Sequence, residues 1–162
     1  MQADKTSCAI RIATTADIAA MVPVINAAFG IEGFLEGERT SRVQLAEMME
    51  KGIFLLGHDH SGKLIASVYV EIRGDRGYFG MLAVDPASQG KGIGRAVVEA
   101  AEGYSRKKGC ADMDLTVLSL RPELPPLYRK LGYVETGTEE FRPTRPLKDG
   151  VECHCILMSK KL

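Results

Sequence analysis

The chain has no tryptophan, few cysteines, no long apolar run and no excess charge of either sign. Its 162 residues contain 21 Lys and Arg against 21 Asp and Glu, so the overall charge favours neither a nucleic acid nor an anionic membrane as a partner. Four scattered cysteines are too few for a disulfide framework. No apolar stretch approaches the roughly 20 residues of a membrane-spanning helix, and residues 1–9 lack the features of a signal peptide. We therefore predict a cytoplasmic protein that binds neither nucleic acids nor membranes.

A metal site is suggested only by the triplet Cys153-His154-Cys155. Neighbouring residues of a strand point to opposite faces, so His154 would face away from both sulfurs. A second cluster of ligands, which a structural metal site requires, is missing from the sequence. We predict ordinary strand residues here and no metal.

The order of apolar residues predicts one mixed α/β domain over residues 1–162. Apolar and polar residues alternate along 64–73, as in a strand, and apolar residues follow helical spacing along 93–104. Pro23 should kink or divide the first helix, a four-residue turn at 74–77 should join two strands, and 142–150 should form a long connection. We expect strands near 8–13, 53–58, 64–73, 78–85, 113–118, 133–140 and 153–159, and helices that begin near Thr15, Ser41, Ile93 and Pro125.

The segment Gln89-Gly90-Lys91-Gly92-Ile93-Gly94 follows an apolar strand-like run and opens an amphipathic helix. Three glycines at alternate positions allow a tight turn that aims several N–H groups into one concavity. The N-terminus of the helix adds unpaired donors and its positive dipole end, and Arg95 follows as a cation. Because the spacing fits neither a Walker loop nor a dinucleotide fingerprint, we predict a different kind of phosphate-binding turn.

Together with a second segment, this turn resembles the GNAT superfamily of N-acetyltransferases. Gln89, Gly92 and Gly94 fill the family's acyl-CoA signature, Gln/Arg-x-x-Gly-x-Gly/Ala, and residues 127–133 are similar to its Leu-Tyr-x-Lys-x-Gly-Phe segment. The similarity covers residues 78–138. It implies the GNAT acyl-CoA N-acyltransferase fold, a mixed twisted sheet flanked by helices. The sheet would splay between the strands at 79–84 and 113–118, with acetyl-CoA in the opening.

The resemblance also implies which residues act. Tyr128 matches the family's general-acid tyrosine, and seven residues earlier Arg121 replaces an asparagine of many relatives. The acceptor would bind near the variable region that holds Phe29, Phe34, Glu36, Glu38 and Arg39. The co-substrate would be held by the strand residues Leu82, Ala83 and Val84, through backbone groups, and by the turn residues Gln89, Gly90, Lys91, Gly92, Ile93, Gly94 and Arg95.

The catalytic base is predicted from strand register. Some relatives carry a glutamate where Tyr78 stands, so that role cannot be transferred. A four-residue turn at 74–77 would pair Glu71 with Gly80 and place Glu71 on the face of Tyr78, beside the space that Gly80 leaves. We predict Glu71 as the base, acting directly or through water; the alternatives are a solvent-facing glutamate or a water chain without it.

These features predict an acetyl-CoA-dependent N-acetyltransferase that acts on a primary amine of a small molecule or protein. Cys110 lacks an activating histidine, so we expect the amine to attack directly in a ternary complex rather than through an acetyl-enzyme. The alternative is a non-catalytic module that binds or senses acyl-CoA. The sequence is compatible with a homodimer and does not require one.

Overall fold

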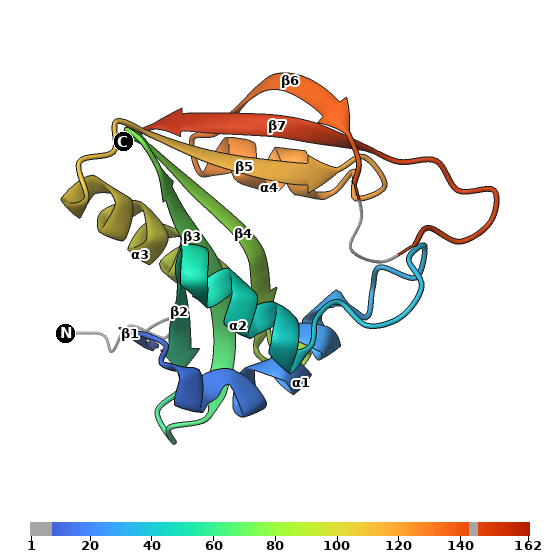
Figure 1. Ribbon diagram of the computed structural model, residues 1–162. Helices are drawn as coiled ribbons and strands as arrows, with labels where there is room; N and C mark the ends of the chain where they lie inside the picture. The colour runs from blue at the N-terminus through green and yellow to red at the C-terminus, as the bar shows by residue number, and fades with distance from the viewer. Residues whose placement is uncertain (1–7, 143–145) are drawn as a thin grey trace.

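The computed structural model describes residues 8–142 and 146–162. Seven strands form one mixed sheet in the order β1-β2-β3-β4-β5-β7-β6, flanked by helices on both faces (Figure 1). This confirms the predicted fold class. The strands are β1 (Ala9–Ile12), β2 (Ile53–His58), β3 (Leu64–Arg73), β4 (Arg76–Val84), β5 (Asp112–Leu118), β6 (Val134–Glu140) and β7 (His154–Lys161). The helices are α1 (Ile18–Phe29), α2 (Arg42–Lys51), α3 (Ile93–Lys107) and α4 (Leu124–Lys130), with short 3-10 turns at Thr15–Asp17 and Pro86–Ser88.

Local signals place most helix ends correctly. The Ser41 side chain accepts a hydrogen bond from the Gln44 amide at 3.2 Å and begins α2, as predicted. Thr15 opens a 3-10 turn rather than capping the first helix, so α1 begins later, at Ile18. Of the two predicted effects of Pro23, division of the helix is wrong, because α1 runs through it unbroken, and a kink stays a prediction. Met21 and Ile25, on either side of Pro23, are fully buried. Their packing stabilises the helix at the position where proline has no N–H to donate.

Helices on opposite faces of β2–β4 enclose two separate cores (Figure 1). One core lies under α3 and α4 and contains Val68, Val70 and Phe79. The other lies under α1 and α2 and contains Phe54 and Tyr69. Because β3 contributes to both cores, its residues from Ile65 to Val70 are all buried. The sheet is therefore the middle layer of three.

The predicted four-residue turn between β3 and β4 is wrong. Arg73 pairs with Arg76, so only Gly74 and Asp75 form the turn. Gly74 has a φ of +65°, the left-handed geometry that two-residue hairpin turns use and glycine tolerates. The register is thereby shifted by two residues, and Glu71 lies opposite Tyr78 instead of Gly80. A shift of two keeps every side chain on its predicted face, so Glu71 still shares a face with Tyr78.

The sheet opens between β4 and β5. These parallel strands pair only at Arg76–Asp112, Gly77–Met113 and Tyr78–Asp114, and then diverge (Figure 1). At the closed end, the Arg76 guanidinium donates two hydrogen bonds of 2.7 Å to Asp114. It also donates to Ser159 on β7 at 2.9 Å, so one side chain joins three strands where the opening begins.

The predicted long connection between the last two strands falls partly on residues 143–145, which lie outside the described residues, as does the N-terminal segment 1–7. Beyond that gap the connection meets the segment that follows α1. Leu147 forms an isolated bridge with Leu35, and the Glu36 amide donates to the Pro146 carbonyl at 2.9 Å. Among the helices of residues 8–142 and 146–162, none has the length and apolar character needed to cross a membrane.

Candidate active site

A bulge at the open end of β4 shapes the candidate site. Ser67 pairs with Ala83 and Tyr69 with Gly80, so β4 has one residue more than β3 over this stretch. Within it Met81 has a φ of +50°, which non-glycine residues seldom adopt. Past Tyr78, no ladder partner on the β5 side of β4 is found among residues 8–142 and 146–162. The bulge therefore lies on a stretch of β4 that does not pair with β5.

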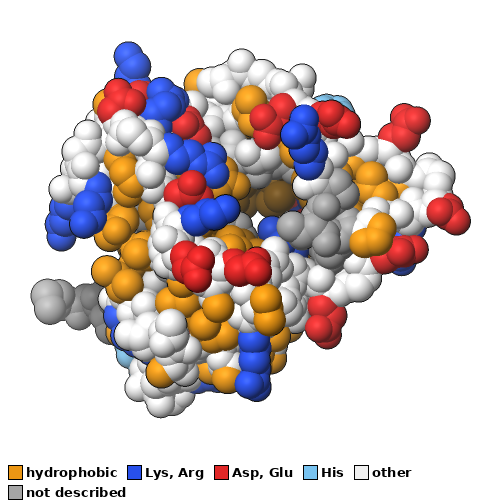
Figure 2. All heavy atoms as spheres, viewed as in Figure 1, with side chains coloured by type: hydrophobic (Ala, Val, Ile, Leu, Met, Phe, Trp, Pro, Cys, Tyr) orange, Lys and Arg blue, Asp and Glu red, His pale blue; other side chains and the backbone are white. Residues whose placement is uncertain are grey.

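A cleft of about 900 Å³ occupies the opening between β4 and β5. Its walls come from β4, the glycine turn, β5 and α4, and its far end from the segments that follow α1 and β6. Figure 2 shows the molecule hollowed near its centre, with a hydrophobic floor and charged side chains close to the rim. The volume lies within the range of pockets for small molecules and cofactors.

The glycine turn forms one end of this cleft. Gly90 and Gly92 have φ values of +79° and +77°, and Gly92 is the residue immediately before α3. The left-handed geometry at both positions requires glycine and turns the chain sharply into the helix. The first amides of α3 have no partners within the helix and carry its positive dipole end. This end of the cleft therefore suits a phosphate group.

The structure places most of the predicted co-substrate residues in the cleft. Its lining includes Leu82, Val84, Gln89, Gly90, Gly92, Ile93 and Gly94. Ala83 points to the opposite core, under α1 and α2. Lys91 and Arg95 are exposed and do not line the cleft, and Arg95 pairs instead with Glu99 at 3.1 Å. Arg95, the predicted cation beside the phosphate site, thus pairs with a glutamate on the surface of α3.

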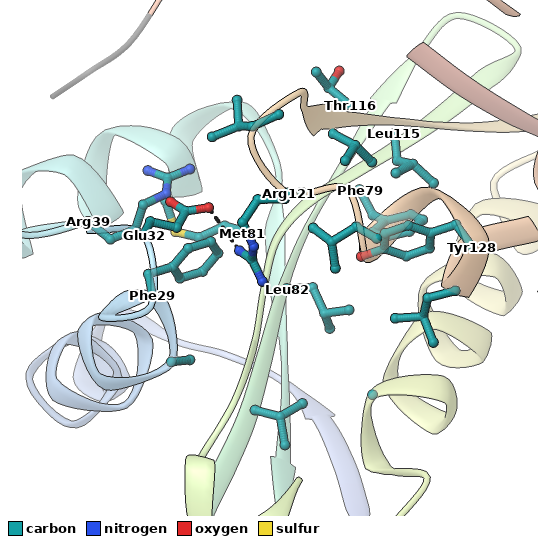
Figure 3. A pocket seen from close by; sticks show the side chains of 18 of the residues that line it. Phe29, Glu32, Arg39, Phe79, Met81, Leu82, Leu115, Thr116, Arg121 and Tyr128 are labelled. Atoms are coloured by element: carbon teal, nitrogen blue, oxygen red, sulfur yellow. Dashed lines mark hydrogen bonds and ion pairs between the residues drawn. The ribbon is translucent and has the colours of Figure 1, made fainter. Parts of the chain in front are cut away.

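Tyr128, near the C-terminal end of α4, lines the same cleft. Its ring packs against Phe79 and its hydroxyl points into the cleft (Figure 3). Burial raises the pKa of the Tyr128 hydroxyl to about 12, although the charge of Arg121 opposes this shift. The phenol therefore stays protonated at neutral pH and can donate a proton or a hydrogen bond to a group bound in the cleft.

An ion pair between a partly buried arginine and a buried glutamate joins two walls of the cleft. The Arg121 guanidinium, on the connection after β5, donates to Glu32, on the connection after α1, at 2.9 Å (Figure 3). Arg121 also pairs with Glu123 at 2.7 Å. Arg121, which stands where many relatives have an asparagine, thus connects the wall after β5 to the wall after α1. Nothing in the sequence pointed to Glu32, because its partner is 89 residues away.

A second cavity of about 400 Å³ adjoins the cleft, under α2. It contains the predicted base Glu71, which does not line the cleft itself. The Glu71 carboxylate accepts from the Tyr69 hydroxyl at 2.8 Å and from Arg73 at 3.1 Å. Burial raises its pKa, but the hydrogen bonds from Arg73 and Tyr69 outweigh this and leave the pKa lowered. Glu71 is therefore ionised at neutral pH.

Tyr78 stands between the two cavities and lines both. Its hydroxyl lies over Gly80, where an added Cβ would be 2.7 Å from the phenol oxygen. The space that we expected beside Gly80 is therefore filled by Tyr78. Of the predicted acceptor residues, Phe29 and Arg39 line the cleft, whereas Phe34, Glu36 and Glu38 do not. The described residues contain no group of three or more His, Cys, Asp or Glu placed to hold a metal ion.

Comparison with known proteins agrees with this geometry. Residues 27–144 match the family model described as the acetyltransferase (GNAT) domain. The chain belongs to the GNAT acetyltransferase family. Membership confirms the resemblance drawn from the glycine turn and from residues 127–133, and it identifies an acetyltransferase domain.

One curated relative of this GNAT domain is the mycothiol acetyltransferase of Propionibacterium freudenreichii subsp. shermanii. It is 25% identical over 140 residues, which cover 82% of the chain and 45% of the relative. The chain thus spans about half the length of the curated relative that it matches.

Solved structures share the fold over nearly the whole chain. The ribosomal-protein-S18-alanine N-acetyltransferase from Escherichia coli superposes with a TM-score of 0.77 at 22% identity, covering 96% of this chain and 94% of that one. The phosphinothricin acetyltransferase from Sinorhizobium meliloti, solved in complex with acetyl-CoA, superposes with a TM-score of 0.74 at 20% identity, covering 96% and 88%. At such identities these likenesses establish the fold.

Proposed function

We propose that this domain transfers the acetyl group of acetyl-CoA to a primary amine by direct attack in a ternary complex. The observation that carries the proposal is the single cleft, which joins the glycine turn, the open edge of β4 and the Tyr128 hydroxyl. Transfer from a CoA thioester to an amine requires bound CoA, a polarised carbonyl, a proton for the departing thiolate and a neutral amine, and the first three requirements match groups in this cleft. The S. meliloti neighbour was solved with acetyl-CoA, which supports the same ligand here.

The residues present fit acetyl-CoA. The amides around Gly92 and Gly94 would hold its pyrophosphate at the N-terminus of α3. The unpaired edge of β4 at Leu82 and Val84 would bind the pantetheine arm and the thioester carbonyl through backbone groups. Lys91 and Arg95 are exposed beside the turn, where they can reach phosphates only from outside the cleft. Because the Ala83 side chain faces the opposite core, the contact that we propose for this residue is a backbone contact.

In the reaction, the neutral amine nitrogen forms a bond to the thioester carbonyl carbon, and the bond from that carbon to sulfur then breaks. The departing thiolate takes a proton from the Tyr128 hydroxyl, which the raised pKa keeps protonated until that moment. The nitrogen loses its extra proton to water, and the products are the amide and free CoA. Tyr128 regains its proton from solvent, so it ends the cycle unchanged.

The amine itself arrives mostly protonated, since an alkyl amine has a pKa near 10. Glu71 remains our candidate for the group that receives the proton. Its carboxylate borders the second cavity, and Glu71 shares a face of the sheet with Tyr78, as the strand pattern predicted. Because Glu71 does not line the cleft, the proton would reach it through water rather than directly.

The competing function is a module that binds or senses acyl-CoA without transfer. Such a module needs the glycine turn and the open edge of β4. It does not need a proton donor such as Tyr128 in the part of the cleft where the thioester would bind. Tyr128 therefore favours the enzyme. An amine panel separates the two, because only the enzyme releases free CoA when an acceptor is added.

The binding site is tested by Gly94→Val, with Gly103→Val as its matched control in the same helix. Gly94 lines the cleft, whereas an added Cβ at Gly103 meets nothing within 4 Å. Gly94 is preferable to Gly92, whose φ of +77° would strain any larger residue. We expect Gly94→Val to weaken acetyl-CoA binding at least tenfold, about 1.4 kcal/mol, measured by calorimetry. Equal affinities in the two variants would exclude this site.

A further inference from the structure

Tyr78 is the residue that separates the cleft from the cavity of Glu71. Four residues line both spaces, and among them only Tyr78 has a hydroxyl group: Arg39, Tyr78, Gly80 and Met81. Its side chain is half-buried, so one side is packed and the other is accessible from the cleft. The phenol oxygen lies over Gly80, next to the bulge of β4 where the thioester carbonyl would bind.

The ring of Tyr78 is held from the side of the second cavity. The Arg73 guanidinium stacks on it, 4.1 Å from the ring centroid, and Glu71 in turn accepts a hydrogen bond from Arg73 at 3.1 Å. Glu71 also lies directly opposite Tyr78 across the β3–β4 ladder. The carboxylate, the guanidinium and the phenol therefore form one connected group that begins in the second cavity and ends in the cleft.

The Tyr78 hydroxyl is neutral at physiological pH. Burial raises its pKa, and the charges of Arg73 and Arg39 and hydrogen bonding with Thr116 oppose this only in part. A neutral phenol cannot keep a proton from an ammonium. It can, however, accept one at its oxygen while it passes its own proton to a water, as an intermediate group between an amine and a carboxylate.

We propose that Tyr78 is a proton relay that orients the acceptor amine in the cleft and connects it to Glu71. The inference rests on the proposed acetyltransferase function. One N–H bond of the acceptor ammonium breaks as an O–H bond forms at the phenol oxygen. The original phenol proton passes through a water to the Glu71 carboxylate. The amine becomes neutral, the phenol is unchanged, and the carboxylic acid returns its proton to solvent, to which the Glu71 side chain is 22% exposed.

The relay is tested with four variants: Tyr78→Phe, Glu71→Gln, their double variant, and Tyr104→Phe as a matched control on α3. Tyr78→Phe keeps the ring under Arg73 but removes the oxygen. We expect kcat/KM for the amine to fall about 10²-fold in Tyr78→Phe and about tenfold in Glu71→Gln, with acetyl-CoA affinity within twofold of wild type in both. Tyr104→Phe should match wild type, since Tyr104 does not line the cleft.

The double variant carries the decisive measurement. If Glu71 receives the proton through Tyr78, adding Glu71→Gln to Tyr78→Phe should cost no further activity. A further tenfold loss would show that Glu71 acts independently and would overturn the relay, as would wild-type kcat/KM in Tyr78→Phe. If Tyr78→Phe also loses acetyl-CoA affinity, the relay is overturned in favour of a packing role. A wild-type protein that binds acetyl-CoA but releases no CoA with any amine would instead overturn the proposed function, and the relay with it.

Discussion

Two networks in this domain join a tyrosine, a glutamate and a cation, one beside the cleft and one inside the fold. Beside the cleft, the Tyr69 hydroxyl donates to Glu71 at 2.8 Å, Arg73 donates to the same carboxylate at 3.1 Å, and its guanidinium stacks on Tyr78. Inside the fold, the Tyr133 hydroxyl donates to Glu102 on α3 at 2.6 Å, and Lys160 on β7 pairs with that carboxylate at 3.1 Å.

The networks differ in what surrounds them. Glu102 is 3% exposed, and its partner Tyr133 is 1% exposed and belongs to the core under α3 and α4. The Glu71 side chain is 22% exposed and borders a cavity. Breaking a buried ion pair leaves a charge without a partner or water, which is strongly destabilising, whereas a solvated pair contributes little. The same chemistry is therefore structural in one place and available for function in the other.

The largest effect that we expect is a loss of turnover in one of two neighbouring tyrosine variants. The ring centroids of Tyr128 and Tyr133 are 6.1 Å apart. Tyr128→Phe should lower turnover about 10²- to 10³-fold, equal to roughly 3–4 kcal/mol in the barrier, because the departing thiolate loses its proton donor. Tyr133→Phe should leave the turnover of the folded enzyme within about twofold. Steady-state kinetics with a responsive amine measures both. Similar losses in the two variants would mean that the cleft and the core network are not separate.

The second comparison removes the two carboxylates. Glu102→Ala should lower the free energy of unfolding by about 2–3 kcal/mol, because it deprives the Lys160 ammonium and the Tyr133 hydroxyl of their partner. We expect a smaller loss than for a fully buried pair, because the Lys160 side chain is 26% exposed and water can solvate its charge. Glu71→Ala should cost less than about 1 kcal/mol. Urea denaturation of both variants checks this, and equal losses would contradict the division into a structural and a functional network.

The smallest effect is a pH dependence of stability. Burial, and then the hydrogen bond to Glu102, raise the pKa of Tyr133 in the folded protein. An unfolded tyrosine ionises near pH 10, so above that pH the unfolded state loses a proton that the folded state retains, and stability falls. Between pH 10 and 11, this one group should account for about 1 kcal/mol of the loss. Tyr133→Phe should show a correspondingly flatter alkaline limb; an unchanged slope would mean that Tyr133 ionises normally in the fold.

Much of the architecture was predictable from the sequence because it depends on neighbours a few residues apart. The alternation along residues 64–73 identified β3, Ser41 and Gln44 identified the start of α2, and three glycines identified the turn that opens α3. A turn or a cap forms between groups that the chain already holds close together. The glycine turn, together with residues 127–133, also carried the family resemblance and, through it, Tyr128.

Only the tertiary structure decided which distant residues meet. The Glu32–Arg121 pair joins residues 89 positions apart, and the cleft exists because β5 leaves β4 after three paired positions. Glu71 is an instructive intermediate case: the alternating pattern placed it on the correct face, but the two-residue turn at Gly74 shifted its partner from Gly80 to Tyr78. A side-chain period of two determines the face, whereas register depends on the turn, the bulge at Met81 and the packing of both cores. The sequence alone therefore indicated the family and the glycine turn before α3. Only the assembled sheet showed that Tyr78 lies between Glu71 and the cleft.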